Sequence, residues 1–296
     1  MRAHAVWGGS TALSIVVAGV LAGVLAGSLS AQVMPPPPYM EIFREEVKAG
    51  RAGPHVQAEA GWPRAFAKAK IPNNYIAMTT MYGPSEAWFF EGHASVADIE
   101  AVNKAIEAAP GLTRELDRLS QADAANVNGL HRLLARHLPE ASNGPGIDPA
   151  EMRVWEITIF RVRPGKEGSF YEGAKLYQSV VQQAQVDAPW VTYEVMAGMP
   201  GPTYLVFVPH KTLAEIDPAV GVGAAIQKAM NEETMKKFGT LSEGFVSVEN
   251  LVFAPSPEMS YPPAEWIAQD PKYWGRKAMS LDRPGPASAQ APAAKP

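Results

Sequence analysis

Two stretches of the chain carry matching residues in the same order, and this repetition constrains the fold more than any other feature. A shift of 115 positions places Glu41, Ile42, Val47 and Gly50 on Glu156, Ile157, Val162 and Gly165. The shift grows to 117 where His93 meets His210, and to 118 where Pro139 meets Pro257. Chance matches would scatter, whereas short loop insertions give a shift that only increases. The sequence therefore predicts one ancestral unit of about a hundred residues, present twice.

Each copy is expected to follow the order βαββαβ. In the second copy, residues 154–162, 190–197, 204–208 and 245–253 have strand character, and residues 170–184 have apolar residues at helical spacing. In the first copy, Leu130 to Leu138 have helical spacing, but the repeat aligns them with the last strand and favours a strand. The predicted class is α+β, with two tandem ferredoxin-like units whose antiparallel sheets pair.

The first 31 residues have the pattern of a signal peptide. Arg2 is followed by an uncharged run from Ala12 to Leu29 and by small residues up to Ala31. This pattern predicts export to the periplasm or the medium and a mature chain that starts near Gln32. A membrane anchor is the alternative, because the run is nearly long enough to span a bilayer.

The expected organisation follows from these two features and from composition. Residues 282–296 are poor in apolar side chains and are expected to be disordered. The segments are a signal peptide (1–31), a Pro-rich lead-in (32–38), repeat 1 (39–142), a linker (143–152), repeat 2 (153–262), a C-terminal extension (263–281) and a disordered tail (282–296).

Composition excludes several classes of function. The chain has no cysteine, so disulfides and thiolate chemistry are absent. Its formal net charge is −4 and no basic run is present, so no nucleic-acid partner is expected. We also expect no membrane partner after signal cleavage, and either a monomer or a homodimer.

Residues 155–166 read Trp-Glu-Ile-Thr-Ile-Phe-Arg-Val-Arg-Pro-Gly-Lys, which resembles the opening strand of NIPSNAP-type domains. The first copy keeps less of this motif, because Glu45 replaces the aromatic residue and Ala49 the proline. These domains belong to the dimeric α/β-barrel superfamily, in which two ferredoxin-like sheets close into a barrel.

The resemblance implies an α/β barrel but transfers no catalytic residues. The superfamily also contains cofactor-independent monooxygenases, haem-degrading enzymes and haem-binding dismutases. The resemblance therefore leaves an enzyme and a haem group open as alternatives, although no cofactor is predicted from the residues themselves.

The histidines of the expected mature chain do not form a recognisable metal motif. His93 and His210 precede helix starts, and His55 takes the helix position of Phe170, where a structural role is expected. His131 and His137 lie too far apart on one strand to share an ion. We therefore predict no metal site.

The candidate ligand site lies on one face of the predicted sheets. We expect the face with Val191, Tyr193 and Val195 to meet the helices, and the opposite face to line the barrel. The candidate binding residues on that opposite face are Glu41, Glu156, Thr158, Trp190, Thr192 and Glu194. Aromatic area beside a few polar groups is typical of a pocket for a small apolar molecule. The alternatives are an enzyme of the superfamily types and a structural protein without a ligand.

Overall fold

The computed structural model describes residues 34–219 and 221–276. The strands are β1 (Tyr39–Val47), β2 (Tyr75–Tyr82), β3 (Glu86–His93), β4 (Val127–His137), β5 (Val154–Val162), β6 (Val191–Ala197), β7 (Thr203–His210) and β8 (Phe245–Pro255). The helices are α1 (Ala52–Glu59), α2 (Gly61–Ala69), α3 (Val96–Ala108), α4 (Leu112–Asp123), α5 (Glu167–Ala184), α6 (Gly221–Ala229), α7 (Glu232–Ser242), α8 (Ala264–Gln269) and α9 (Pro271–Trp274). The predicted signal peptide, cleavage site and disordered tail lie outside the described residues.

The eight strands form one closed barrel in the order β1-β3-β2-β8-β5-β7-β6-β4, and every neighbouring pair is antiparallel. The predicted α+β class is confirmed, and the barrel closes within a single chain. Both halves have the same internal order, β4-β1-β3-β2 and β8-β5-β7-β6. The halves join where β2 pairs with β8 and where β4 pairs with β6.

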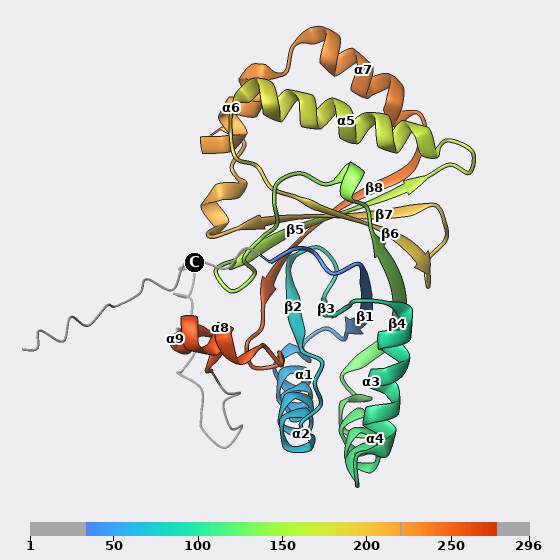
Figure 1. Cartoon of the computed structure of the whole chain (residues 1–296), viewed down its shortest axis with the longest axis vertical. Coiled ribbons are helices and arrows are strands. Elements are labelled where there is room, and N and C mark those ends of the chain that lie inside the picture. Colours follow the sequence, from blue (N-terminus) through green and yellow to red (C-terminus); the bar gives the residue numbers. More distant parts are fainter. Residues whose placement is uncertain (1–33, 220, 277–296) are drawn as a thin grey trace, which may run out of the picture. The chain divides into compact units, whose positions relative to one another are not determined.

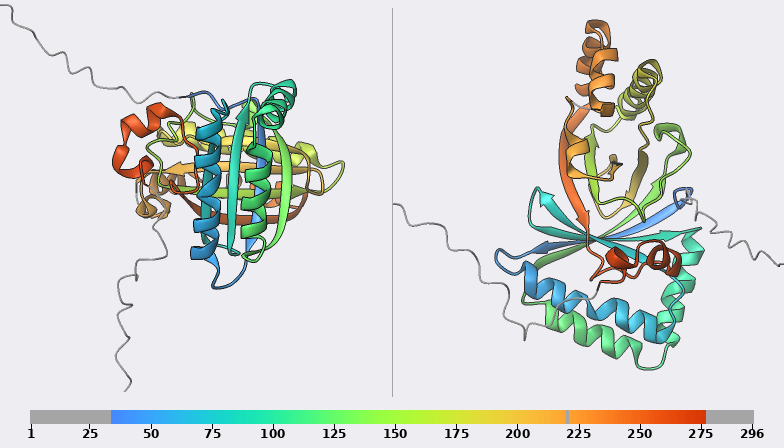
Figure 2. Two further views of the ribbon diagram at one scale, coloured as in Figure 1. Left: turned by 90° about the horizontal axis from the view of Figure 1, so that it is seen from below. Right: turned by 90° about the vertical axis from the view of Figure 1, so that its left-hand side faces the viewer.

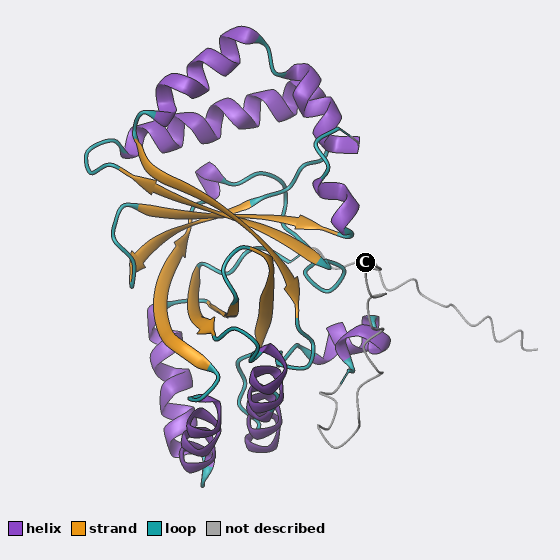
Figure 3. Cartoon of the chain, turned by 180° about the vertical axis from the view of Figure 1, so that it is seen from behind, coloured by secondary structure: helices purple, strands orange, loops and turns teal. Residues whose placement is uncertain are grey.

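Helices cover the outer faces of both halves. Helices α1 to α4 lie against β1–β4, and α5 to α7 lie against β5–β8 (Figure 1; Figure 3, purple on orange). After β8 the chain runs beside β2, where Tyr75 and Tyr261 exchange backbone hydrogen bonds of 3.0 Å, and it continues into α8 and α9 (Figure 2, red). Among the described residues, none of the helices combines the length and apolar character needed to cross a membrane.

The barrel interior is filled by apolar side chains from both halves. Strand alternation in β5 turns Trp155, Ile157 and Ile159 inward, where all three are buried. Aromatic rings meet across the halves, with centroids 5.2 Å apart for Trp88 and Phe253. These residues therefore form a packed core inside the barrel.

The expected strand over Leu130 to Leu138 is confirmed as β4, in spite of its helical leucine spacing. Strand β4 pairs along β1 and, at its far end, with β6. Its alternation buries Leu133 and Ala135 in the barrel core and leaves Leu130 exposed.

Candidate functional site

A cluster of three carboxylates and one histidine lies between β1 and helices α1 and α4. Its members are Glu45, His55, Glu59 and Asp123, which we call the His55 cluster. Glu45 lies near the end of β1, and Asp123 is the last residue of α4. His55 and Glu59 are four residues apart on α1, so they share one face of that helix. One ligand atom from each residue falls within 4.8 Å of those of the other three.

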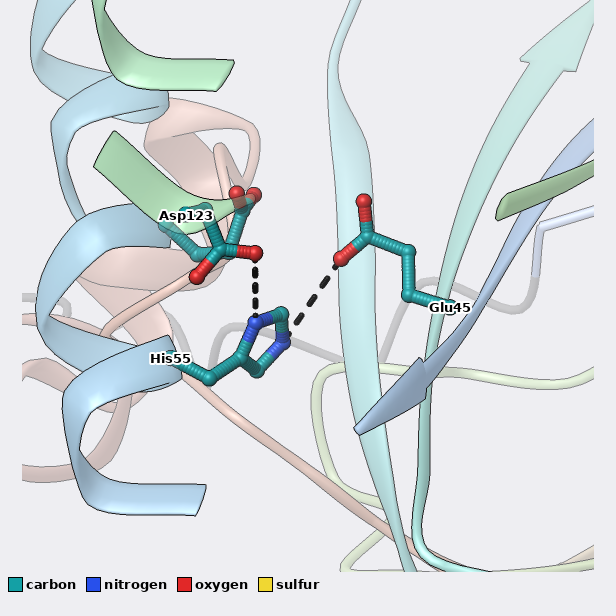
Figure 4. Close-up of side chains that lie close together, drawn as sticks. Glu45, His55 and Asp123 are labelled. Atoms are coloured by element: carbon teal, nitrogen blue, oxygen red, sulfur yellow. Dashed lines mark hydrogen bonds and ion pairs between the residues drawn. The ribbon is translucent and has the colours of Figure 1, made fainter. Parts of the chain in front are cut away.

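The His55 ring is held at one nitrogen and lacks a partner at the other. Nδ1 lies 2.9 Å from Asp123 Oδ2, whereas Nε2 points toward Glu45 Oε2 at 3.7 Å (Figure 4). Neither Nε2 nor that Glu45 oxygen has a hydrogen-bond partner, and the His55 side chain is only 1% exposed. A buried polar atom without a partner costs about 1–3 kcal/mol, so such an atom calls for an explanation.

Burial and mutual repulsion disfavour the ionised carboxylates in this cluster. Burial raises the pKa of Glu45 to about 7, while His55 opposes the increase and Asp123 adds to it. Burial also raises the pKa of Glu59 well above its ordinary value, and the Glu45 and Asp123 carboxylates add to that effect. Three carboxylates this close cannot all ionise in a dry site unless a positive charge joins them.

A pocket of about 420 Å³ opens beside the cluster, on the outside of the barrel. His55 contributes to its wall, together with Val47, Ala52, Gly53, Val56, Gln57, Thr79, Thr80, Ser85, Glu86 and Glu258. The Glu86 carboxylate itself turns to the barrel side, where it accepts two hydrogen bonds from Arg44, of 2.9 and 2.7 Å, and one of 2.7 Å from Nε1 of the core residue Trp88. The polar residues Gln57, Thr79 and Ser85 line the pocket next to His55.

The corresponding place in the second half is filled by aromatic rings. Glu45 and Phe160 are each third from the end of their strand, and His55 and Phe170 each follow eight positions after that strand end. In the second half, the Phe160 and Phe170 rings pack at 5.4 Å, and Phe170 stacks on Tyr204 at 4.0 Å. The fold is thus built without a polar cluster at this place, so the His55 cluster is not a requirement of the architecture.

The predicted face assignment of β6 is wrong. Val191, Tyr193 and Val195 belong to the barrel core, whereas Trp190 packs outward against Val181 and other apolar residues of α5 and α6. The interior is enclosed on all sides and therefore takes the uniformly apolar face. The mixed face turns outward, where its polar atoms find partners.

The structure does not bring the six predicted binding residues into one cavity. Their partners are separate: Glu41 with Arg132 (2.8 Å), Glu156 with His210 (2.8 Å), Thr158 with Asn250 (2.8 Å), Trp190 and Thr192 with the Ala141 carbonyl (2.7 and 2.8 Å), and Glu194 with Arg136 (2.6 Å). Of these six residues, Trp190 alone lines a described pocket, of about 190 Å³ outside the barrel.

Sequence reasoning missed Glu59 and Asp123, because nothing near them in the chain marks them. It did register that Glu45 and His55 stand where the second copy has aromatic residues. The signal was therefore present, since two polar replacements on facing elements of one copy point to a shared site. The spacing of histidines does not reveal this cluster, because three of its four members are carboxylates.

Neither His55 nor His93 is placed to hold a haem group. The barrel core contains no histidine, and the Nε2 atoms of His55 and His93 both face carboxylates rather than an apolar slot. A flat apolar macrocycle has no matching surface at either nitrogen.

No family model matches the chain, and no curated protein matches it. Among solved structures, a Fusobacterium nucleatum protein provisionally assigned as a monooxygenase is 10% identical over 75% of this chain and 94% of that one, with a TM-score of 0.49. An anthrone oxidase-like protein is 10% identical over 74% and 91%, with a TM-score of 0.47. A chlorite dismutase variant from Candidatus Nitrospira defluvii is 8% identical over 80% and 97%, with a TM-score of 0.43. Similarity this low leaves the chemistry to the chain's own residues.

Proposed function

We propose that this chain binds a divalent transition-metal ion at the His55 cluster. The observation that carries the proposal is the unpartnered Nε2 of His55, which is buried and points at carboxylate oxygen. Its Nδ1 is held by Asp123, the arrangement that fixes ring orientation in metal-binding histidines. His55, Glu45 and Glu59 would then be the ligands, and Asp123 would orient the histidine.

The mixed nitrogen and oxygen ligands favour zinc, manganese or ferrous iron over calcium or magnesium, which prefer oxygen alone. The positive charge would allow the neighbouring carboxylates to ionise together. An ion with three protein ligands also keeps a position for water or a substrate.

The adjacent pocket supports a narrower candidate function, metal-assisted chemistry on a small molecule. On this proposal, the small ligand expected from the sequence would bind beside the metal ion instead of between the two sheets. The Gln57, Thr79 and Ser85 side chains of its wall favour a molecule with polar atoms.

The test is the metal content of the purified chain after equilibrium dialysis against zinc or manganese. His55→Phe, which copies the second half, is expected to lose one equivalent while retaining the fold. His131→Phe is the matched control, because that histidine is exposed and lies outside the cluster. Equal metal content in His55→Phe and the unaltered chain would refute the proposed site.

Two further proposals rest on the sequence. Export is supported by the pattern of residues 1–31, and N-terminal sequencing of released material tests it by reading a start near Gln32 rather than Met1. Tandem duplication of a NIPSNAP-like unit is supported by the stepwise shifts and by the equal strand order of the halves. A homodimer or a monomer is compatible with a barrel that closes within one chain.

A further inference from the structure

A second cluster lies at the opposite end of β1 from the His55 cluster. It consists of Glu41 on β1 and of Glu91 and His93 on β3, and we call it the His93 cluster. His93 Nε2 lies 3.6 Å from Glu41 Oε2 and 3.8 Å from Glu91 Oε2. The His93 side chain is fully buried, and its Nε2 has no hydrogen-bond partner.

Each of the three side chains has a polar partner outside the cluster. Asp98 Oδ2 lies 3.3 Å from His93 Nδ1, and Arg132 contacts Glu41 Oε1 at 2.8 Å. Asn73 Nδ2 donates to Glu91 Oε2 at 3.1 Å. The supporting residues thus fix three potential ligand atoms around one point, which is the arrangement that orients metal ligands.

The second half provides an internal comparison. There, His210 Nε2 lies 2.8 Å from Glu156, and the two side chains form a direct hydrogen bond. Val208 stands opposite Glu156, as Glu91 stands opposite Glu41. In the second half, one carboxylate and the histidine bond directly to each other. In the first half, His93 Nε2 lies 3.6 and 3.8 Å from two carboxylates and hydrogen-bonds to neither.

We propose that Glu41, Glu91 and His93 bind a second divalent transition-metal ion, such as zinc or manganese. One imidazole and two carboxylates suit such an ion. The formal charge of the site is −2, from three carboxylates (Glu41, Glu91 and Asp98) and one guanidinium (Arg132). A divalent ion balances this charge. The two clusters share no residue, so this site does not depend on the His55 site.

The test counts metal equivalents in the purified full chain after dialysis against zinc, and follows cobalt binding by visible absorption. Glu91→Val, which copies Val208, is expected to lose one of two equivalents. His55→Phe is expected to lose the other, and the double variant both. Glu156→Gln is the matched control, because it alters the closed pair of the second half and is expected to keep two.

Glu91→Gln covers the case in which Glu91→Val fails to fold, because its amide oxygen can still accept from Asn73. It is expected to weaken cobalt binding at this site at least tenfold. Two equivalents of unchanged affinity in a folded Glu91 variant would overturn the proposal. If His55→Phe keeps its full metal content while the Glu91 variants lose one equivalent, the His55 site fails and the His93 site stands.

Discussion

His55 and Phe170 occupy corresponding places but have opposite chemistry. Phe170 lies in an aromatic cluster that stabilises its half of the barrel. His55 places a polar ring with an unpartnered nitrogen in the same setting, at a cost of about 1–3 kcal/mol. The second half folds with an aromatic cluster at this place. Folding therefore does not require the polar His55 cluster of the first half.

We expect His55→Phe to change the stability of the metal-free chain by no more than about 3 kcal/mol. The variant removes the unpartnered Nε2, whose burial is costly, but it also deprives the buried Asp123 carboxylate of its 2.9 Å partner, and the two effects oppose each other. Urea unfolding in the presence of a chelator measures the change, and His131→Phe should stay within about 0.5 kcal/mol of the unaltered chain. Destabilisation of His55→Phe by more than about 3 kcal/mol would mean that the cluster supports the fold.

Glu91 should make the metal-free chain less stable as the pH rises. Burial, together with Glu41, raises the pKa of Glu91 from 4.5 to about 7 in the folded state. Between these values the folded chain holds a proton that the unfolded chain has lost. The contribution is therefore complete below pH 4.5 and is lost as the pH approaches 7, a change on the order of 3 kcal/mol.

Glu91→Gln provides the comparison for this effect, because it cannot ionise. Unfolding by urea at pH 4.5 and pH 7 with a chelator should show a smaller decrease in stability for the variant than for the unaltered chain. Equal decreases in both would show that Glu91 does not ionise in this range.

At the scale of single elements, strand pairing determines the structure where the local sequence pattern is ambiguous. The leucines of β4 suggested a helix, but β4 is bonded to β1 and β6 on its two sides, and those long-range bonds select the strand. Strand β6 itself was predicted correctly, whereas its orientation was not. Alternation shows that a strand has two faces, but only the closed barrel determines which one is enclosed.

The turn after β6 is a sensitive point of the junction between the halves. Gly198 has φ of +96°, and an added Cβ would meet the backbone carbonyl of Arg132 in β4. We expect Gly198→Ala to cost about 3 kcal/mol or more, because both strain and a backbone clash oppose it. Thermal unfolding of the variant measures the loss.

Gly165→Ala separates the two causes. Gly165 has a similar φ of +82°, but nothing lies within 4 Å of an added Cβ. Gly165→Ala should lose only about 1–2 kcal/mol of stability, which is the cost of the left-handed conformation for a residue with a Cβ. Equal losses at both glycines would show that the β4 backbone yields and that the contact is unimportant.

At the scale of the whole molecule, the two halves share one core. Phe90 and Phe207 meet at 5.7 Å, and the interior cluster draws on strands of both halves. The sequence predicted this pairing of sheets because each copy alone has an apolar face to cover. It did not predict the proposed metal site, since the His55 cluster is assembled from β1, α1 and α4 on the outside of the barrel.

We expect the halves to be unstable when separated. A chain divided near Gly146 exposes the interior face of each sheet and leaves four strand edges unpaired. Expression of residues 32–145 and 147–296 as separate chains, followed by dye binding and circular dichroism, tests this. Mixing the two is expected to restore the signal of the intact barrel, whereas two soluble halves that each unfold cooperatively would argue against a shared core.

The strand order also determines how the barrel can form during synthesis. Strand β2 ends at Tyr82, but its second neighbour, β8, begins only at Phe245. At the usual pace of translation, roughly ten to thirty seconds separate the two strands. Throughout that interval β2 presents a bare edge on which another nascent chain can add a strand. The yield of folded protein should therefore depend on what shields this edge before β8 arrives, even though the finished barrel has no edge left.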